Sequence, residues 1–280
     1  MSPQPGTITS LHAEPTIAET VLTWDPLGWD PLIDHYRIYA VAGESAPAEP
    51  NEQDLLGKTV YPRFVHDGQD PAGETWTYRV PAVSDAGLRS EPGETVTASS
   101  LASVTSTGRA VATIGDFDGR TLEHRHAPAD YTRIPEDHPE ALISFVQGTD
   151  TPGEAWPYLL PGPGDAWAGS RDYRARWTLA IEDPQVPHDL ALWLVDTTRL
   201  GGTLRISVDG EHMAEVELPL GATRGSREGD ANVPGTALMP SYHELEIPQQ
   251  MLPAGECEIE FHLAEGGWVA WDAIGVFARE

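Results

Sequence analysis

Residues 74–92 read ETWTYRVPAVSDAGLRSEP, and this stretch decides the fold of the first hundred residues. From Trp76 onward, Trp76, Tyr78, Val80 and Ala82 share one face of an extended strand, and the residues between the first three are polar. An apolar face opposite a polar face is typical of a strand in a β-sandwich, where one side meets the core. The stretch therefore predicts a sandwich.

The flanking sequence repeats this strand pattern. Tyr36 and Ile38 fall on one face of a predicted strand, and Trp24 ends another strand just before a turn. Glycine, proline and aspartate separate the segments, as expected of turns. The segments are VLTWDP (21–26), IDHYRIYA (33–40), PRFVHDG (62–68) and PGETVTA (92–98).

Together these segments resemble a fibronectin type III domain between residues 5 and 100. The resemblance implies that Trp24 is buried on the second strand and that Trp76 stands where the family usually has its corner tyrosine. A tryptophan there cannot donate the usual hydroxyl hydrogen bond, and Pro81 lacks an amide inside a strand, which predicts a bulge. We expect a first domain at 1–104, short linker included, that serves as a spacer or docking module.

The composition favours an all-β protein and excludes nucleic-acid binding. Short strand-like runs are separated by many of the 27 glycines and 25 prolines, and no run approaches the ~18 apolar residues of a membrane span. The net charge is −27, and Lys58 is the only lysine, whereas a phosphate backbone requires a basic face. Cys257 is the only cysteine, so a disulfide framework is excluded.

A second domain is predicted at 105–280, after the Ser- and Thr-rich link TASSLASVTSTG. Nine strand-like segments with turns between them fit a jelly-roll β-sandwich, and Asp209-Gly210 predicts a tight hairpin. The segments are AVATIG (110–115), ALISFVQG (141–148), RWTLAIED (176–183), DLALWLVDT (189–197), TLRISVDG (203–210), AEVELPL (214–220), HELEIP (243–248), ECEIEFHLAE (256–265) and VAWDAIGVFAR (269–279).

The motifs TIGDFDG, SFVQGTD, RWTLAIED, LALWLVDT and WDAIGVF resemble those of one known module. It is the C-terminal carbohydrate-binding-like jelly roll of rhamnogalacturonan lyases, polysaccharide lyase family 4, and the resemblance covers residues 110–280. In that family the jelly roll follows a fibronectin-like domain, so the order of domains agrees. The large N-terminal sandwich that carries the lyase chemistry has no counterpart in the sequence. No residue therefore inherits a catalytic role.

The loop GEAWPYLLPGPGDAWAGSR (153–171) combines aromatic residues with glycine and proline. Aromatic rings stack on the C–H faces of sugars, so Tyr158 and Trp167 are candidate ligand-binding residues. The alternative for such a loop is a small core of its own, and we assign Trp156 to this anchoring role.

Arginines follow the aromatic loop directly. Arg171 and Arg174 are candidate ligands for sugar hydroxyls or carboxylates, and with Arg176 they form the densest positive patch of an acidic chain. Trp268 and Trp271 are spaced to face opposite sides of the last strand, so one is expected in the core. Trp268 is included among the candidate ligand-binding residues.

The sequence predicts either no cofactor or a structural calcium ion. Asp116, Asp118 and Asp272 supply carboxylates, the ligands that calcium prefers, and ordinary turn aspartates are the alternative. The spacing of His124 and His126 suits two metal ligands on one strand face. Because no third ligand stands nearby in sequence, we expect them on a solvated strand edge.

The sequence thus predicts a non-catalytic carbohydrate-binding accessory protein, or fragment, of a rhamnogalacturonan-type polysaccharide lyase. Two alternatives stay open: a small lyase or glycoside hydrolase in its own right, and a structural docking subunit without glycan binding. The expected partners are a polysaccharide or oligosaccharide and a catalytic lyase domain or subunit. Residues 2–6 lack the features of a leader, so the location is extracellular if a leader was removed and cytoplasmic if the chain is complete. The polar stretch 221–240 is expected to be a binding loop or a poorly ordered excursion.

Overall fold

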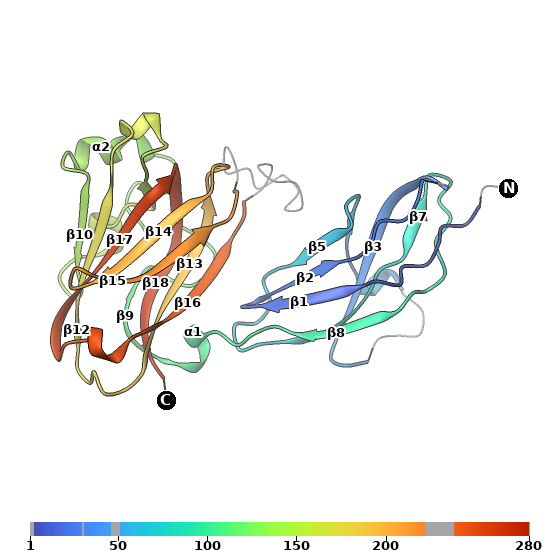
Figure 1. Ribbon diagram of the computed structural model, residues 1–280, viewed down its shortest axis with the longest axis horizontal. Coiled ribbons are helices and arrows are strands. Elements are labelled where there is room, and N and C mark those ends of the chain that lie inside the picture. Colours follow the sequence, from blue (N-terminus) through green and yellow to red (C-terminus); the bar gives the residue numbers. More distant parts are fainter. Residues whose placement is uncertain (1–2, 30, 46–50, 222–237, 280) are drawn as a thin grey trace. The chain divides into compact units, whose positions relative to one another are not determined.

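The computed structural model describes residues 3–29, 31–45, 51–221 and 238–279, so most of the predicted 221–240 loop lies outside the described residues. The chain is nearly all β, as predicted, and divides into two compact units, Met1–Ser106 and Thr107–Glu280 (Figure 1). In the described part of the chain, no helix has both the length and the apolar character that a membrane span requires.

The first unit is a sandwich of two antiparallel sheets with fibronectin type III order. One described sheet has the order β1-β2-β5, and the other has the order β4-β3-β6-β8 with β7 also paired to β3. The strands are β1 (His12–Thr16), β2 (Glu19–Thr23), β3 (Ile33–Ala42), β4 (Leu55–Thr59), β5 (Arg63–His66), β6 (Thr75–Arg79), β7 (Ala82–Ser84) and β8 (Thr95–Ser99). The short helices η1 (Glu52–Asp54) and α1 (Val104–Thr107) complete the unit and the link to the next.

The alternation of residues 76–82 sets the core of this unit, as predicted. Tyr78, Val80 and Ala82 are all buried against the facing sheet. Trp24 is buried as well, and its ring meets the ring of Tyr36 edge-on at 5.2 Å. This burial removes large apolar surfaces from water and stabilises the packing of the two sheets.

Pro81 interrupts the strand instead of forming the β-bulge that the sequence predicted. β6 ends at Arg79 and β7 begins at Ala82, while the Pro81 carbonyl accepts a hydrogen bond from the Arg37 amide at 3.0 Å. A proline has no amide for the sheet ladder, so the pairing stops there. Trp76 donates its indole N–H to Glu74 at 3.0 Å in place of a corner hydroxyl.

The second unit is a jelly-roll sandwich of two five-stranded sheets within the described residues, and all nine predicted strands are present. One sheet has the order β10-β12-β17-β14-β15. The other has the order β11-β18-β13-β16, with β9 also paired to β18. The strands are β9 (Arg109–Ile114), β10 (Leu142–Val146), β11 (Leu159–Pro161), β12 (Arg174–Ile181), β13 (His188–Thr197), β14 (Gly202–Val208), β15 (Glu211–Leu218), β16 (Ser241–Ile247), β17 (Gly255–Gly266) and β18 (Trp268–Ala278).

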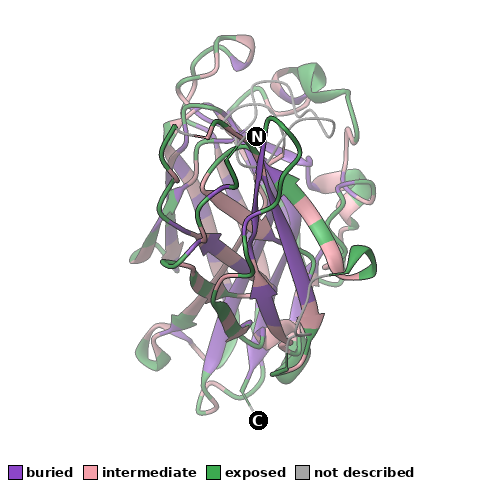
Figure 2. Cartoon of the chain, turned by 90° about the vertical axis from the view of Figure 1, so that its right-hand side faces the viewer, coloured by how far each residue is buried: buried purple, intermediate pink, exposed green. Residues whose placement is uncertain are grey.

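Buried residues lie mainly on the strands and exposed ones on the connections between them (Figure 2). Trp156, Trp177, Phe261 and Trp271 have essentially no exposed surface and lie in the core of the second unit. The predicted hairpin joins β14 to β15 through Asp209 and Gly210. Both residues have positive φ, 48° and 81°, which is the requirement of a type I′ turn.

Candidate functional site

The segment 153–171 begins with a buried half that is part of the core. The Trp156 ring centroid lies 6.0 Å from that of Trp271 and 6.2 Å from that of Phe261. The short helix α3 (Pro152–Ala155) precedes Trp156, and β11 follows it and pairs with β18. The predicted anchoring role of Trp156 is confirmed. The strand β11 was not predicted, because three residues are too few for a visible alternation.

The second half of the segment carries Trp167 on the short helix η3 (Ala166–Ala168). Trp167 is half-buried, and its ring lies 4.9 Å from that of Tyr131 with an angle of 75° between the planes. Tyr131 belongs to η2 (Tyr131–Arg133) and is 37% exposed. Trp167 also packs against the core, so the part of the two rings that a ligand can reach is the part exposed to solvent. The sequence did not reveal Tyr131, since only the folding of two loops brings it to Trp167.

Backbone hydrogen bonds hold the turn that presents Trp167. The Ser170 amide donates to the Asp165 carbonyl at 2.9 Å, and the Gly169 amide donates to the Ala166 carbonyl at 3.1 Å. Burial raises the pKa of the Asp165 carboxyl, and a hydrogen bond from Trp167 opposes that shift. The aromatic pair therefore sits on a turn with its own internal bonds rather than on a loose loop.

Tyr158, predicted to stack on a sugar, is only 8% exposed. Burial raises the pKa of its hydroxyl to about 12, with smaller contributions from Tyr131 and Asp130. The phenol is thus neutral at physiological pH and close to Tyr131. Little of its ring surface is available for stacking, although the hydroxyl remains a donor.

Arg171 ties two loops together. Its guanidinium donates a hydrogen bond to the Pro139 carbonyl and lies 5.7 Å from the ring centroid of the buried Tyr173. Residue 139 precedes β10, and Arg171 follows the turn of Trp167, so this contact joins the two loops. Arg171 is half-buried and follows Trp167 by four residues in the chain.

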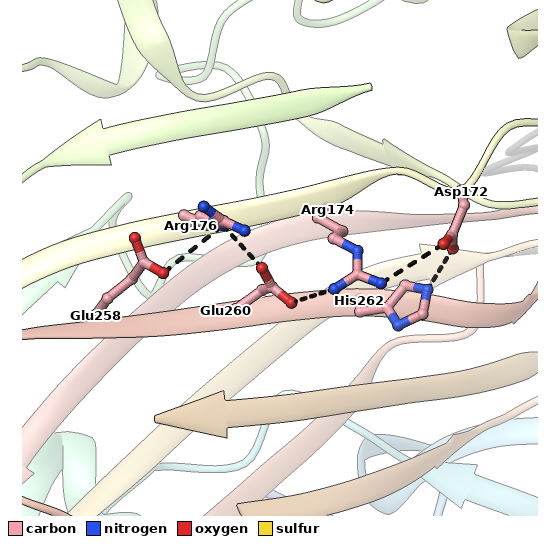
Figure 3. A network of polar contacts seen from close by, with 6 residues as sticks. All are labelled: Asp172, Arg174, Arg176, Glu258, Glu260 and His262. Carbon is pink, nitrogen blue, oxygen red and sulfur yellow. Dashed lines mark hydrogen bonds and ion pairs between the residues drawn. The ribbon is translucent and has the colours of Figure 1, made fainter. Parts of the chain in front are cut away.

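Arg174 and Arg176 belong instead to an ion-pair network on the outer face of a sheet (Figure 3). Glu260 on β17 accepts from Arg174 and from Arg176, each at 2.8 Å. Asp172 lies 3.7 Å from Arg174, and Glu258 lies 3.6 Å from Arg176. Two arginines thus face three carboxylates, and the predicted positive patch is neutralised. The cause is the register of β12 and β17, which the sequence alone does not give.

Trp268 begins β18 and is half-buried, whereas Trp271 is fully buried in the core. The expectation that one of the two lies in the core is confirmed for Trp271, while Trp268 packs against the same cluster of core residues and stays partly exposed. The pairing of β13 with β18 has register irregularities next to Trp271, which disturb the regular alternation.

Asp272 holds the GDFDG turn. It is 1% exposed, and its Oδ1 accepts the Arg120 amide at 2.9 Å. Burial raises the pKa of this carboxyl to about 7. In the described ranges of the chain, no three His, Cys, Asp or Glu residues are grouped so that they could hold a metal ion, and the calcium role of Asp116, Asp118 and Asp272 stays a prediction.

The two histidines are buried in a loop, and the predicted solvated strand edge is wrong. His124 Nε2 lies 2.7 Å from the Asp272 carbonyl oxygen, and burial lowers the pKa of the imidazole. His126 Nε2 lies 3.0 Å from Asp137, which also accepts from Arg125 at 2.6 Å. These contacts order the loop that leads to Tyr131.

No protein-family model matches the chain, and no curated protein matches it either. Solved structures that resemble parts of it include fibronectin type III domains and carbohydrate-binding modules. The twitchin kinase region of C. elegans is 21% identical over 41% of this chain and 19% of its own length, with a TM-score of 0.30. A human fibronectin type III domain is 19% identical over 36% of this chain and 82% of its own length, also with a TM-score of 0.30.

The carbohydrate-binding neighbours are similarly distant. The CBM36-1 domain of a xylanase from the hindgut metagenome of Trinervitermes trinervoides is 11% identical over 39% of this chain and 73% of that one, with a TM-score of 0.28. A family 35 carbohydrate-binding module from an environmental isolate is 12% identical over 38% of this chain and 70% of its own length, also with a TM-score of 0.28. Likenesses this weak carry no argument about the site, which rests on its own geometry.

Proposed function

We propose that the second unit binds a carbohydrate through loops of its sandwich and that the protein is not an enzyme. The observation that carries the proposal is the Tyr131–Trp167 pair. Its two rings touch edge to face and are both partly open to solvent. Such rings stack on the C–H faces of sugars. Because the turn around Trp167 has its own hydrogen bonds, little ordering would be needed on binding.

The proposed ligand is a plant-type polysaccharide that contains rhamnose or uronate. The proposed context is the accessory part of a rhamnogalacturonan lyase-like protein, either as a fragment or as a separate partner. The motif resemblance over residues 110–280 and the order of the two proposed domains, 1–104 and 105–280, support this assignment. Arg171 is the proposed polar contact beside the rings. Arg174 would contact a ligand only after leaving Glu260.

The test is affinity electrophoresis of the full chain in gels that contain rhamnogalacturonan, galactan or polygalacturonate. We expect at least one polysaccharide to retard the wild type, and Trp167→Ala and Tyr131→Ala to abolish that retardation. Trp29→Ala is the matched control, because Trp29 is 88% exposed and belongs to the other unit. Its retardation should equal that of the wild type.

Three results would contradict the proposal. A wild type that no polysaccharide retards would favour the docking-subunit alternative. Retardation lost with Trp29→Ala but kept with Trp167→Ala would locate binding in the first unit. Cleavage of any of the polysaccharides by the pure chain, seen as new reducing ends, would make the protein an enzyme.

A further inference from the structure

A cleft of about 360 Å³ opens where β14 begins and where β15 and β17 end. This volume lies within the range of sites for small ligands. The aromatic pair does not line it. It is therefore a separate feature of the second unit, and its chemistry can be read from its floor and its walls.

The floor of the cleft is bare backbone. Gly164, Gly201, Gly202 and Gly266 line it, and their chains pack too closely to admit side chains. A Cβ atom on Gly202 would lie 2.2 Å from the Glu265 carbonyl oxygen, and one on Gly266 would lie 2.1 Å from the Gly201 carbonyl oxygen. Side chains on these residues would clash with the neighbouring backbone, so the close approach of these segments requires glycine and leaves backbone atoms at the surface of the cleft.

The walls combine apolar and acidic groups. Leu200 and Leu220 line the cleft and are 55% and 56% exposed, so they give the cleft apolar surface. Glu217 accepts a hydrogen bond from the Thr203 hydroxyl at 3.2 Å, and Glu265 is the second carboxylate. No arginine or lysine is found among the described residues that line the cleft. Carboxylates accept hydrogen bonds from hydroxyl groups and repel anions.

The cleft and the aromatic pair share one loop. Gly164 lines the cleft and is three residues from Trp167, so their Cα atoms lie at most about 11 Å apart. The Gly164 amide donates to the Gly266 carbonyl at 2.8 Å, which fixes the loop to the edge of the cleft. A chain of sugar units held by one feature could therefore reach the other.

We propose that this cleft is a second subsite, specific for an uncharged sugar unit, next to the Tyr131–Trp167 pair. The inference rests on the proposed carbohydrate binding and extends it: the ligand is an oligosaccharide of several units, and the unit in the cleft carries hydroxyls but no carboxylate. Leu200 and Leu220 contact its C–H surface, and the carboxylates of Glu217 and Glu265 accept hydrogen bonds from its hydroxyl groups.

The test is calorimetric titration of the full chain with rhamnogalacturonan fragments of two and six units and with galactan and galacturonan hexasaccharides. We expect Glu217→Gln and Leu200→Ala to weaken hexasaccharide binding about threefold to tenfold. Binding of the two-unit fragment, held by the rings, should stay within about twofold of wild type. Glu217→Arg should improve binding of the galacturonan hexasaccharide relative to that of galactan, because it replaces repulsion by attraction.

The outcomes separate this inference from the proposed function. If polysaccharide retards the wild type and Trp167→Ala abolishes the effect, carbohydrate binding stands. The cleft subsite is then overturned if the hexasaccharide binds no better than the two-unit fragment, or if Glu217→Gln and Leu200→Ala leave its affinity unchanged. Unchanged thermal midpoints would show that these exposed substitutions preserve the fold, and Glu217→Gln keeps the shape of the side chain.

Discussion

The two halves of the segment 153–171 have similar residue types and different roles. Both contain a tryptophan among glycines and prolines, yet Trp156 is fully buried and Trp167 is half-buried beside Tyr131. The difference lies in the backbone. The first half forms β11 and pairs with the interior strand β18, whereas the second half closes a turn on itself. The half that leads into a paired strand thus has its tryptophan in the core, and the half that forms a turn has its tryptophan partly exposed.

Trp156→Ala should have the largest effect on stability. The substitution leaves a cavity among Phe145, Phe261 and Trp271, so we expect a loss of about 3–5 kcal/mol in the free energy of unfolding. Denaturant titration of the full chain, followed by a signal of the second unit, measures this loss. A loss below about 1 kcal/mol would show that the first half is not a core element.

Tyr158→Phe tests the buried half through its pH dependence. The folded-state pKa of Tyr158 is raised from 10.0 to about 12, so the unfolded chain loses its phenolic proton first as the pH rises. The associated stability is complete below pH 10 and is lost between pH 10 and 12. We expect the wild type to lose about 1–2 kcal/mol more than Tyr158→Phe over that range. Equal pH profiles of the two proteins would indicate a solvated hydroxyl.

Trp167→Ala should cost less stability than Trp156→Ala, while it abolishes binding. The substitution removes the edge contact with Tyr131, the hydrogen bond to the Asp165 carboxyl and the partial burial against the core, which together amount to about 1–2 kcal/mol. Denaturant titration and affinity electrophoresis on the same sample compare the two effects. If Trp167→Ala destabilised the protein as much as Trp156→Ala does, Trp167 would be a core residue like Trp156, and the two halves of the segment would not differ in role.

Arg171→Ala should have the smallest effect on stability. It removes one hydrogen bond to the Pro139 carbonyl and one contact with the Tyr173 ring, so we expect about 0.5–1 kcal/mol. Arg171→Lys keeps the charge but not the planar group, and serves as the matched variant. If binding weakens in Arg171→Ala and recovers in Arg171→Lys, the charge contributes to ligand binding. If neither changes it, Arg171 only joins the two loops.

Much of the fold could be predicted from the sequence, because alternation over five or more residues is a local signal. The strand at Trp76 and the hairpin at Asp209-Gly210 are examples. By contrast, β11 has three residues and depends on its pairing with β18. A local pattern cannot contain that information.

The candidate site was predicted only in part, and for a similar reason. The place of Trp167 follows from its glycine-rich turn, but its partner Tyr131 comes from another loop. Arg174 and Arg176 formed a positive patch in the sequence, and their neighbour Glu260 is supplied by a strand far along the chain. Charge in a sequence is therefore a weak guide to charge on a surface when the sheet register is unknown.

The position of β18 has a consequence for how the chain folds. β18 pairs with β9, β11 and β13, and Ile274 on β18 lies opposite Ile114 on β9. The first strand of the second unit, β9, therefore cannot pair until the last strand, β18, is present. During synthesis this sheet lacks β18 until the chain has been made as far as Ala278. Such distant pairing slows folding and exposes unpaired edges in the meantime. We infer that the second unit folds in one step after β18 has been made. The first unit can fold earlier, because its described strands pair with one another.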